Sequence, residues 1–246
     1  MVGSGKGGVG KSTIALNLAR AFNRQAPGRV GLLDADLHGP NIPRMLGITH
    51  DAWTHAWTMA RPGPREKTQP TLAEGLKLVS AGMFLGEDQA LGMDGMTLGT
   101  FMRHLALDAE WGDLDFLVVD LPPGTGDAQK ALAAAILVAG AIVVVTPQEL
   151  AHLDAAKAIR MFRQMKIRVI GGIENMSWFA CPSCGQRTAV FPPVATERSI
   201  WNDVERLEAL PLIPAFATVG GAATDRDTDA TFDGLATRLS ALLASR

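Results

Sequence analysis

A glycine-rich loop near the start of the chain limits the folds that the chain can adopt. Residues 5–13 read GKGGVGKST and fit the pattern G-x-x-x-x-G-K-[ST], in which backbone N–H groups wrap phosphates and the lysine reaches the terminal ones. Such a loop joins a buried strand to a helix, and the positive end of the helix dipole points at the anion. The loop therefore predicts an α/β fold with a nucleotide bound by Gly5, Lys6, Gly7, Gly8, Val9, Gly10, Lys11, Ser12 and Thr13.

Two lysines give the loop its chemistry. Lys11 is the lysine of the general pattern, and we expect the hydroxyl of Ser12 on Mg²⁺. Lys6 is an additional, earlier lysine, and with it the loop resembles the deviant Walker A subclass, K-G-G-x-G-K-[ST]. In that subclass the extra lysine reaches phosphates across a dimer interface, where its charge acts as an arginine finger does when the γ-phosphoryl group leaves. We therefore expect Lys6 and Lys11 to be catalytic; the alternative for Lys6 is a solvated loop lysine.

Short apolar segments alternate along the chain with segments of helical spacing. Continuous apolar runs suit strands that are buried on both faces of a parallel sheet. The order of the elements predicts an α/β fold, a doubly wound, mostly parallel sheet with helices on both faces, in one domain over residues 1–246. We predict strands at 29–34, 76–80, 115–120, 141–146 and 168–173, and helices at 12–25, 98–110, 128–138, 152–165, 199–209 and 231–244.

Two stretches do not fit this alternation. Only Met1 and Val2 precede the loop, where a strand is expected. Either that strand is very short or the chain begins inside a longer product, and we favour the second. The proline-containing segment 50–70 is interpreted as an irregular excursion.

Three aspartates follow predicted strands. Asp34 and Asp36 stand at alternate positions, so both leave the strand on one face, where they can meet Mg²⁺ and the attacking water. We assign Asp36 to orient that water or to hold Mg²⁺ through it; Asp34 is the second candidate, or the cap of the next helix. Asp120 ends an apolar strand in the Walker B pattern and is expected to hold Mg²⁺ through water. The turn at 121–127 is expected to sense the γ-phosphate as a switch.

The two cysteines of the chain stand three positions apart. Cys181 and Cys184 lie in the sequence CPSCG, a knuckle whose thiolates converge on one metal. Zn²⁺ or an iron–sulfur cluster usually takes four protein ligands, so a twofold homodimer would supply the missing two. Their spacing leaves zinc, an iron–sulfur cluster and a redox dithiol open. None of the five histidines has metal-ligand spacing to the knuckle, and we interpret them as surface or capping residues.

Charge and hydropathy restrict the partners. The net charge is -2 and the basic residues are scattered, which argues against a nucleic-acid partner. The longest apolar run, 131–145, contains Gly140 and is too short to cross a bilayer. No signal peptide is visible, so we expect a cytoplasmic protein without a membrane partner.

Five motifs follow one another along the chain: GSGKGGVGKS at 3–12, DAD at 34–36, DLPPGTGD at 120–127, TPQE at 146–149 and ENMS at 174–177, which leads to the cysteine knuckle. In this order, over residues 3–191, they resemble the Mrp/ApbC family of P-loop ATPases, which belong to the MinD/ParA-like class and carry iron–sulfur clusters. The resemblance implies a homodimeric, slow ATPase with ATP and Mg²⁺ at each loop, Asn175 on the adenine, and one [4Fe-4S] cluster held by Cys181 and Cys184 of both subunits. On this resemblance the cluster is preferred to Zn²⁺.

The resemblance implies a carrier that transfers its cluster to apo-proteins and works with scaffold proteins. Two other functions stay open: a positioning ATPase of the MinD/ParA type, and an ATPase adaptor whose dimer is held by structural zinc. The positioning ATPase would need a membrane- or DNA-binding surface. The amphipathic segment 231–246 carries only Arg238 and Arg246 on its polar face, which is weak for anionic lipid, so we interpret it as a helix that packs on the core.

Overall fold

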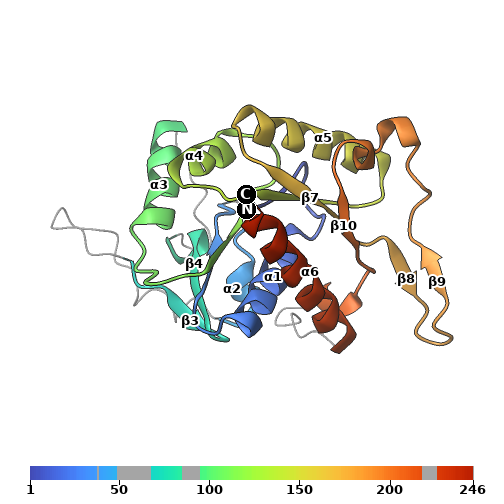
Figure 1. The fold of residues 1–246 in the computed structure, drawn as a ribbon, viewed down its shortest axis with the longest axis horizontal. Coiled ribbons are helices and arrows are strands. Elements are labelled where there is room, and N and C mark those ends of the chain that lie inside the picture. The colour runs from blue at the N-terminus through green and yellow to red at the C-terminus, as the bar shows by residue number, and fades with distance from the viewer. Residues whose placement is uncertain (38, 49–67, 85–94, 218–225, 246) are drawn as a thin grey trace.

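A mostly parallel sheet runs through the molecule and carries helices on both faces (Figure 1). The structure is a computed structural model that describes residues 1–37, 39–48, 68–84, 95–217 and 226–245. The strand order is β10-β7-β6-β1-β5-β2-β4-β3, with β3 antiparallel to β4 and the other pairs parallel, which confirms the predicted doubly wound sheet. The strands are β1 (Val2–Ser4), β2 (Val30–Asp34), β3 (Thr71–Ala73), β4 (Leu76–Ser80), β5 (Phe116–Asp120), β6 (Ala141–Val145), β7 (Val169–Glu174) and β10 (Arg206–Ala209).

The helices cover the two faces of the sheet in two groups. On one face lie α1 (Lys11–Gln25), the short α2 (Ile42–Met45) and α6 (Arg226–Ala244), and α1 packs against α6. On the other face lie α3 (Gly95–Leu107), α4 (Asp127–Ala135) and α5 (Glu149–Gln164). Across the part of the chain that the structure describes, no helix is both long and apolar enough to span a membrane.

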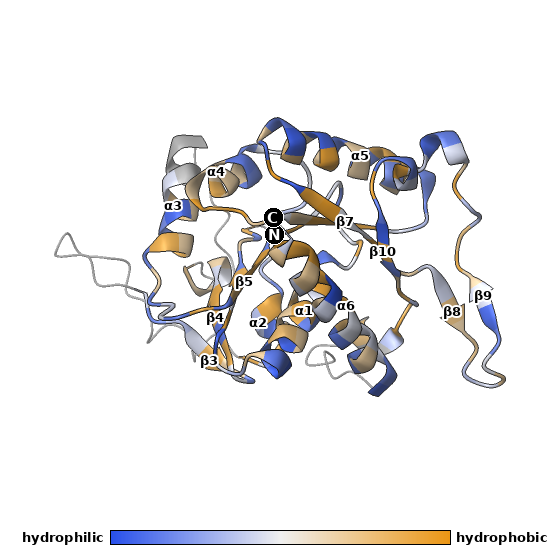
Figure 2. Cartoon of the chain, viewed as in Figure 1, coloured by the Kyte–Doolittle hydropathy of each residue, from blue (hydrophilic) through white to orange (hydrophobic). Residues whose placement is uncertain are grey.

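Consecutive residues of the central strands enter different cores. Leu32 and Val118 pack in the core beneath α1 and α6, whereas Leu33 and Val119 pack in the core beneath α3, α4 and α5. Side chains alternate between the faces of a strand, so a strand that is covered on both faces is apolar throughout. Figure 2 shows this continuous apolar character along β5 and β7. The predicted strands were therefore recognisable from short apolar runs.

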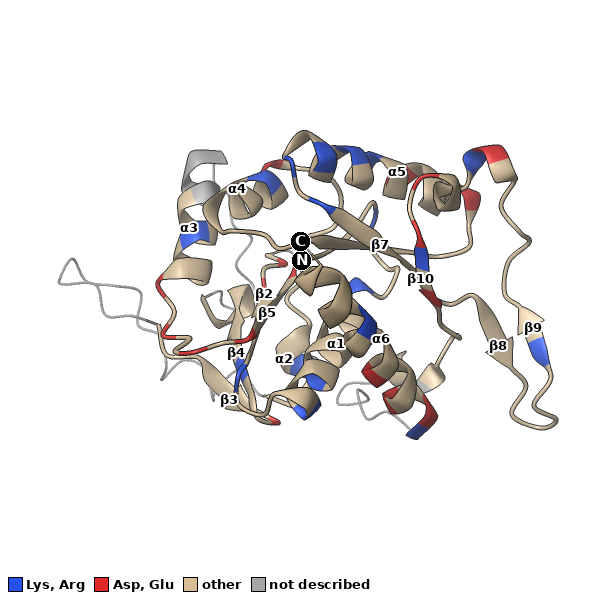
Figure 3. Cartoon of the chain, viewed as in Figure 1, with Lys and Arg blue, Asp and Glu red and all other residues tan. Residues whose placement is uncertain are grey.

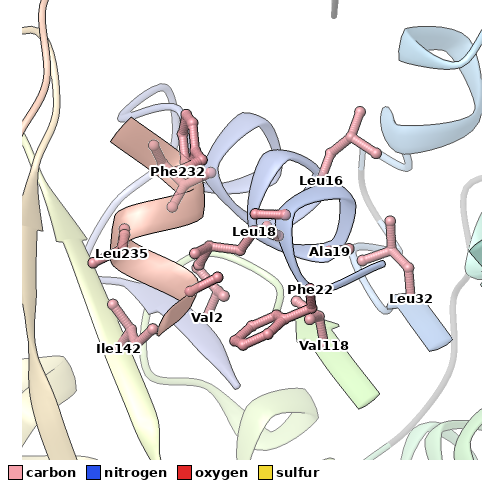
Figure 4. Packing of buried hydrophobic residues seen from close by; sticks show 14 of the residues in the cluster. Val2, Leu16, Leu18, Ala19, Phe22, Leu32, Val118, Ile142, Phe232 and Leu235 are labelled. Carbon is pink, nitrogen blue, oxygen red and sulfur yellow. The ribbon is translucent and has the colours of Figure 1, made fainter. Parts of the chain in front are cut away.

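The C-terminal helix α6 packs on the core, as predicted, and begins at Arg226 rather than at residue 231. Phe232 and Leu235 on α6 point toward Leu18 of α1 and Val2 of β1 (Figure 4). All four side chains are buried. The apolar face of this helix is thus occupied within the chain.

The predicted helix at 199–209 is wrong. The structure has a 3-10 turn at Ile200–Asn202, followed by β10, which extends the sheet beyond β7. Ile200, Val204 and Leu207 have helical spacing, but the first two pack in the core beneath α5 and Leu207 packs in the other core. These apolar residues pack on opposite faces of the sheet, but their spacing in the sequence is the spacing expected for one face of a helix.

A strand of three residues, β1, precedes the loop and pairs with both β5 and β6, which confirms the alternative of a very short strand at this position. Other short strands have no counterpart in the sequence analysis. The strands β8 (Trp178–Ala180) and β9 (Arg187–Ala189) form a hairpin apart from the sheet, and this hairpin carries the two cysteines (Figure 1). Most of the segment 50–70 lies outside the described residues, as do three histidines, His38, His50 and His55.

Packing of α6 can be tested by a single truncation. Leu235 is 3% exposed, and Leu235→Ala is expected to lower the free energy of unfolding by about 2–5 kcal/mol through lost burial and the cavity that remains. Leu137 is 95% exposed, so Leu137→Ala should change stability by less than about 0.5 kcal/mol. Urea unfolding followed by circular dichroism measures both. Equal losses in the two variants would contradict this packing.

Candidate functional site

A cavity of about 430 Å³ opens where β1, β2, β5 and β7 end. Parallel strands place their carboxyl ends at one edge of the sheet, which is where ligands bind in open α/β folds. The glycine-rich loop forms one wall, and α2 forms another. The lining residues are Ser4, Lys6, Gly7, Gly8, Gly10, Lys11, Ser12, Thr13, Asp36, Asn41, Arg44, Met45, Pro123, Met176 and Phe216.

Two glycines let the loop lie tightly against its neighbours. A Cβ on Gly5 would lie 2.1 Å from the backbone carbon of Asp154 on α5. Gly10 has φ +85, and a Cβ there would lie 2.2 Å from Nδ2 of Asn175. That same Nδ2 donates to the carbonyl of Val9 at 2.9 Å. The loop is therefore clamped between α5 and the end of β7, in a conformation that only glycine adopts easily.

Lys11 forms a buried ion pair at the floor of the cavity. Its Nζ lies 2.7 Å from Oδ1 of Asp120 and 3.7 Å from Oδ2 of Asp36. Burial raises the pKa of Asp120, while the neighbouring Lys11 lowers it. The structure therefore brings together Lys11, Asp36 and Asp120, which the sequence analysis assigned to catalysis or to Mg²⁺.

The same group suits a magnesium ion. Oδ2 of Asp120 is buried and has no hydrogen-bond partner within the described part of the chain. The hydroxyl of Ser12 lies 3.4 Å from Nζ of Lys11, beside that carboxylate. Mg²⁺ prefers oxygen ligands and usually keeps several waters while it binds one or two carboxylates and substrate phosphates. Ser12 and the carboxylates of Asp120 and Asp36 are such a set.

Asp34 lies behind this group and bonds to the backbone. Its carboxylate accepts from the N–H of Ile42, the first residue of α2, at 3.3 Å and from the hydroxyl of Ser80 at 3.0 Å. Burial, and then the charge of Asp120, raises the pKa of Asp34 to about 8. Of the two roles considered for Asp34, this position matches that of a residue that caps the next helix, whereas Asp36 lines the cavity.

Lys6 bonds to a residue of the same chain. Its Nζ donates to Oε1 of Gln148 at 3.0 Å, and the hydroxyl of Thr146 donates to the same oxygen at 2.9 Å. Gln148 is the residue before α5. The motif TPQE was noted in the sequence, but its contact with Lys6 joins residues 142 positions apart and had no sequence signal.

The cysteine pair lies at the tip of the β8–β9 hairpin, whose residues 182–189 are all exposed. The N–H of Gly185 donates to the carbonyl of Cys181 at 2.8 Å, which closes the turn. Backbone N–H groups of Ser183 and Cys184 lower the pKa of the Cys181 thiol because they stabilise the thiolate. Within the described ranges, no group of three or more His, Cys, Asp or Glu side chains is arranged to hold a metal. The knuckle therefore offers two thiolates from this chain.

A buried histidine lies behind the end of β7, and its interpretation as a surface residue is wrong. His152 on α5 is fully buried, with its ring edge-on to that of Trp201 at 5.6 Å. Its Nδ1 accepts from the N–H of Ile200, and its Nε2 lies 3.9 Å from Oε1 of Glu174. The i, i+3, i+4 pattern of α5 could have revealed this burial, because His152 shares a face with Ala155 and Ile159.

The fold and the cavity define a P-loop NTPase of the MinD/ParA-like class. MinD from Pyrococcus horikoshii, solved with Mg-ADP, superposes with a TM-score of 0.66 over 100% of this chain and 98% of that chain; at 21% identity this shows the fold alone. A nucleotide-binding protein from Archaeoglobus fulgidus, solved in complex with ADP, is 33% identical with a TM-score of 0.68, over 96% of this chain and 86% of that chain.

Within this class the family can be stated. The model of the family described as ParA, NUBPL iron-transfer P-loop NTPase, matches residues 1–238. The chain belongs to this family, as the resemblance in the sequence implied.

Individual relatives carry names of the same kind. An iron–sulfur cluster carrier protein of Synechocystis is 44% identical over 187 residues, which are 76% of this chain and 51% of the relative. The mouse iron–sulfur cluster transfer protein NUBPL is 40% identical over 192 residues, 78% of this chain and 58% of the relative. The chain thus spans about half the length of these curated relatives.

The buried histidine predicts a dependence of stability on pH. Burial lowers the pKa of His152 below its ordinary 6.5, and the opposing effect of Glu174 is smaller. At pH values below about 6.5 this histidine is protonated in the unfolded chain, whereas it stays neutral in the native protein. The free energy of unfolding therefore decreases as the pH falls. His152→Gln should flatten the dependence of the unfolding free energy between about pH 7.5 and about pH 5 in urea titrations. Equal slopes in wild type and His152→Gln would contradict the assignment.

Proposed function

We propose that the chain is an ATP-hydrolysing iron–sulfur cluster carrier that holds one [4Fe-4S] cluster between two subunits and delivers it to apo-proteins. The observation that carries the proposal is the exposed hairpin with two thiols and no further ligand of its own among the described residues. A cluster needs more thiolates than one chain presents here, and a twofold axis supplies them. Relatives more than 40% identical are named as iron–sulfur cluster carrier proteins.

The hairpin suits a site that must release its cargo. Both cysteines lie at a tip that packs against no core cluster, so a cluster there would be accessible to an acceptor protein. The lowered pKa of the Cys181 thiol favours the thiolate that binds iron. The same features would serve a zinc-bound adaptor dimer, and the name of the relatives, rather than the geometry, favours the cluster.

The loop would act on ATP as follows. Lys11 would leave Asp120 for the phosphates, Ser12 would bind Mg²⁺ directly, and Asp120 would hold it through water. Asp36 would hold Mg²⁺ through water or orient the attacking water. Lys6 would exchange Gln148 for the phosphates of the other subunit, where its charge stabilises the transition state. Both lysines therefore change partners when the nucleotide arrives, and the adenine would lie near Asn175, which borders the loop.

A positioning ATPase of the MinD/ParA type is a second alternative, and one observation weighs against it. The apolar face of the terminal helix, including Phe232 and Leu235, is buried against α1 and is not available to a membrane. Vesicle co-sedimentation that required ATP would reverse this judgement.

Anaerobic reconstitution with iron and sulfide tests the cargo. We expect the wild-type protein to gain the visible absorption of thiolate-bound iron–sulfur and to bind iron and sulfide in the ratio of one cluster per dimer. Cys184→Ser should abolish the absorption, whereas Ser183→Ala, between the cysteines, should retain it. Tightly bound zinc that iron does not replace would favour the adaptor.

The role of Lys6 predicts a loss of turnover without a loss of binding. Lys6→Ala should lower kcat by about a thousandfold, which is the lower end of what an arginine finger contributes. Nucleotide affinity should change only a few fold, since Lys11 and the loop remain. Lys130→Ala, an exposed lysine on α4, is the control. Phosphate release and fluorescent-nucleotide titration measure the two quantities, and a variant with unchanged kcat would show that Lys6 is a solvated lysine.

A further inference from the structure

A turn of five residues separates the nucleotide cavity from the cysteine hairpin. At its start, Asn175 bonds to the phosphate loop and Met176 lines the cavity. At its end, Trp178 is the first residue of β8, three residues before Cys181. Met176 has φ +57, a left-handed conformation that non-glycine residues rarely adopt. Contacts around the turn must hold that conformation in place.

The carboxylate of Glu174 links the turn to its surroundings. Its Oε2 and the backbone carbonyl oxygen of the same residue each lie 2.9 Å from the hydroxyl of Ser177, which has one proton to share between them. Its Oε1 accepts from the indole N–H of Trp201 at 3.1 Å. The guanidinium of Arg206 on β10 lies 3.5 Å from Oε2. Glu174 is 9% exposed, and a carboxylate removed from water is retained only when donors satisfy it. Here donors from the turn, a 3-10 turn and β10 converge on it.

The base of the hairpin depends on the same turn. The N–H of Ser177 donates to the carbonyl of Leu210 at 2.9 Å, and the N–H of Leu212 donates to the carbonyl of Trp178 at 2.7 Å. Beyond Trp178 the hairpin is held mainly by its own pairing of β8 with β9 and by the guanidinium of Arg187, which lies 4.2 Å from the centre of the Trp178 ring. A small rotation at the turn would therefore move both cysteines together.

Glu174 also faces the helix that orients Lys6. Because Nδ1 of His152 accepts from Ile200, the proton of a neutral ring is on Nε2, which lies 3.9 Å from Oε1 of Glu174. That distance is too long for a hydrogen bond but short enough for a small movement of α5 to close it. Gln148, which holds Lys6, lies four residues before His152.

We propose that Glu174 is a positioning residue for both sites: its carboxylate holds the turn at 174–178 so that a change at the phosphate loop is transmitted to the hairpin that carries Cys181 and Cys184. The part of the proposal that concerns the cluster rests on the proposed function. The part that concerns movement of the hairpin does not rest on the proposed function, because it requires only that the protein binds a nucleotide and carries the hairpin.

Hydrogen exchange of the cluster-free, full-length protein tests the coupling. We expect Mg-ADP to slow exchange in peptides that span residues 178–189 by about fivefold or more, the lower end of ordinary coupling between sites. Ser177→Ala should bind fluorescent ADP within about twofold of wild type and lose this response, because it removes the link to the hairpin and leaves Trp201 and Arg206 on Glu174.

Glu174→Gln removes the negative charge of this side chain and keeps its shape, so it tests the contribution of the charge alone. The amide keeps one acceptor for Trp201 or Ser177 and loses the ion pair with Arg206, so the hairpin response should be reduced but present. Glu174→Ala should lose the response and bind ADP about tenfold more weakly. The reason is that the residue before Asn175 loses its contacts, so Asn175 is held less firmly against the phosphate loop. Glu208→Ala is the matched control, because this carboxylate on β10 accepts from the backbone N–H of Ala209, the next residue.

Two results would overturn the proposal. One is a wild-type hairpin that does not respond to Mg-ADP, and the other is an equal response in wild type, Ser177→Ala and Glu174→Ala. If Glu174→Ala fails to fold, Ser177→Ala still decides the question. Because no cluster is present, failure of the protein to bind iron and sulfide would leave this result untouched and would count against the proposed function alone.

Discussion

The buried contact between Lys11 and Asp120 is the interaction on which the site depends. Parallel pairing of β2 with β5 sets Asp34 opposite Asp120, so two buried carboxylates lie side by side at the centre of the sheet. Their mutual repulsion contributes to the raised pKa of Asp34, and the charge of Lys11 opposes it. Removing one member of such a buried set would leave an uncompensated charge, which costs several kcal/mol.

This arrangement also explains how a nucleotide could enter without a large rearrangement of the sheet. In the structure the ammonium group of Lys11 lies 2.7 Å from Oδ1 of Asp120 and balances its charge. If bound phosphates drew the lysine away, Mg²⁺ held by the same carboxylates would supply the positive charge in its place. The charge of the site would then be balanced both with and without Mg-ATP, while the loop, clamped by Asn175 and α5, could keep its shape.

How far the sequence predicts such a site depends on how local its contacts are. The loop, Asp36 and Asp120 were predictable because each follows a short apolar strand, and parallel strands end at one edge. The partners of Lys6 and Glu174 were not, because Gln148 and Trp201 reach them through the packing of α5 and β10, and no short-range pattern records that packing. The segment 199–209 failed for a related reason: its apolar residues serve two cores.

By itself, the sequence determined the chemistry of this protein: a loop that binds phosphates, carboxylates at strand ends, two thiols and the family to which the chain belongs. Only the tertiary structure decided that Lys6 is held by Gln148 of the same chain and that a single turn joins the nucleotide cavity to the cysteines. The physical reason is that residue type and spacing specify which groups a segment can offer. Which of those groups meet is decided by how helices and strands distant in the chain pack on the two faces of the sheet.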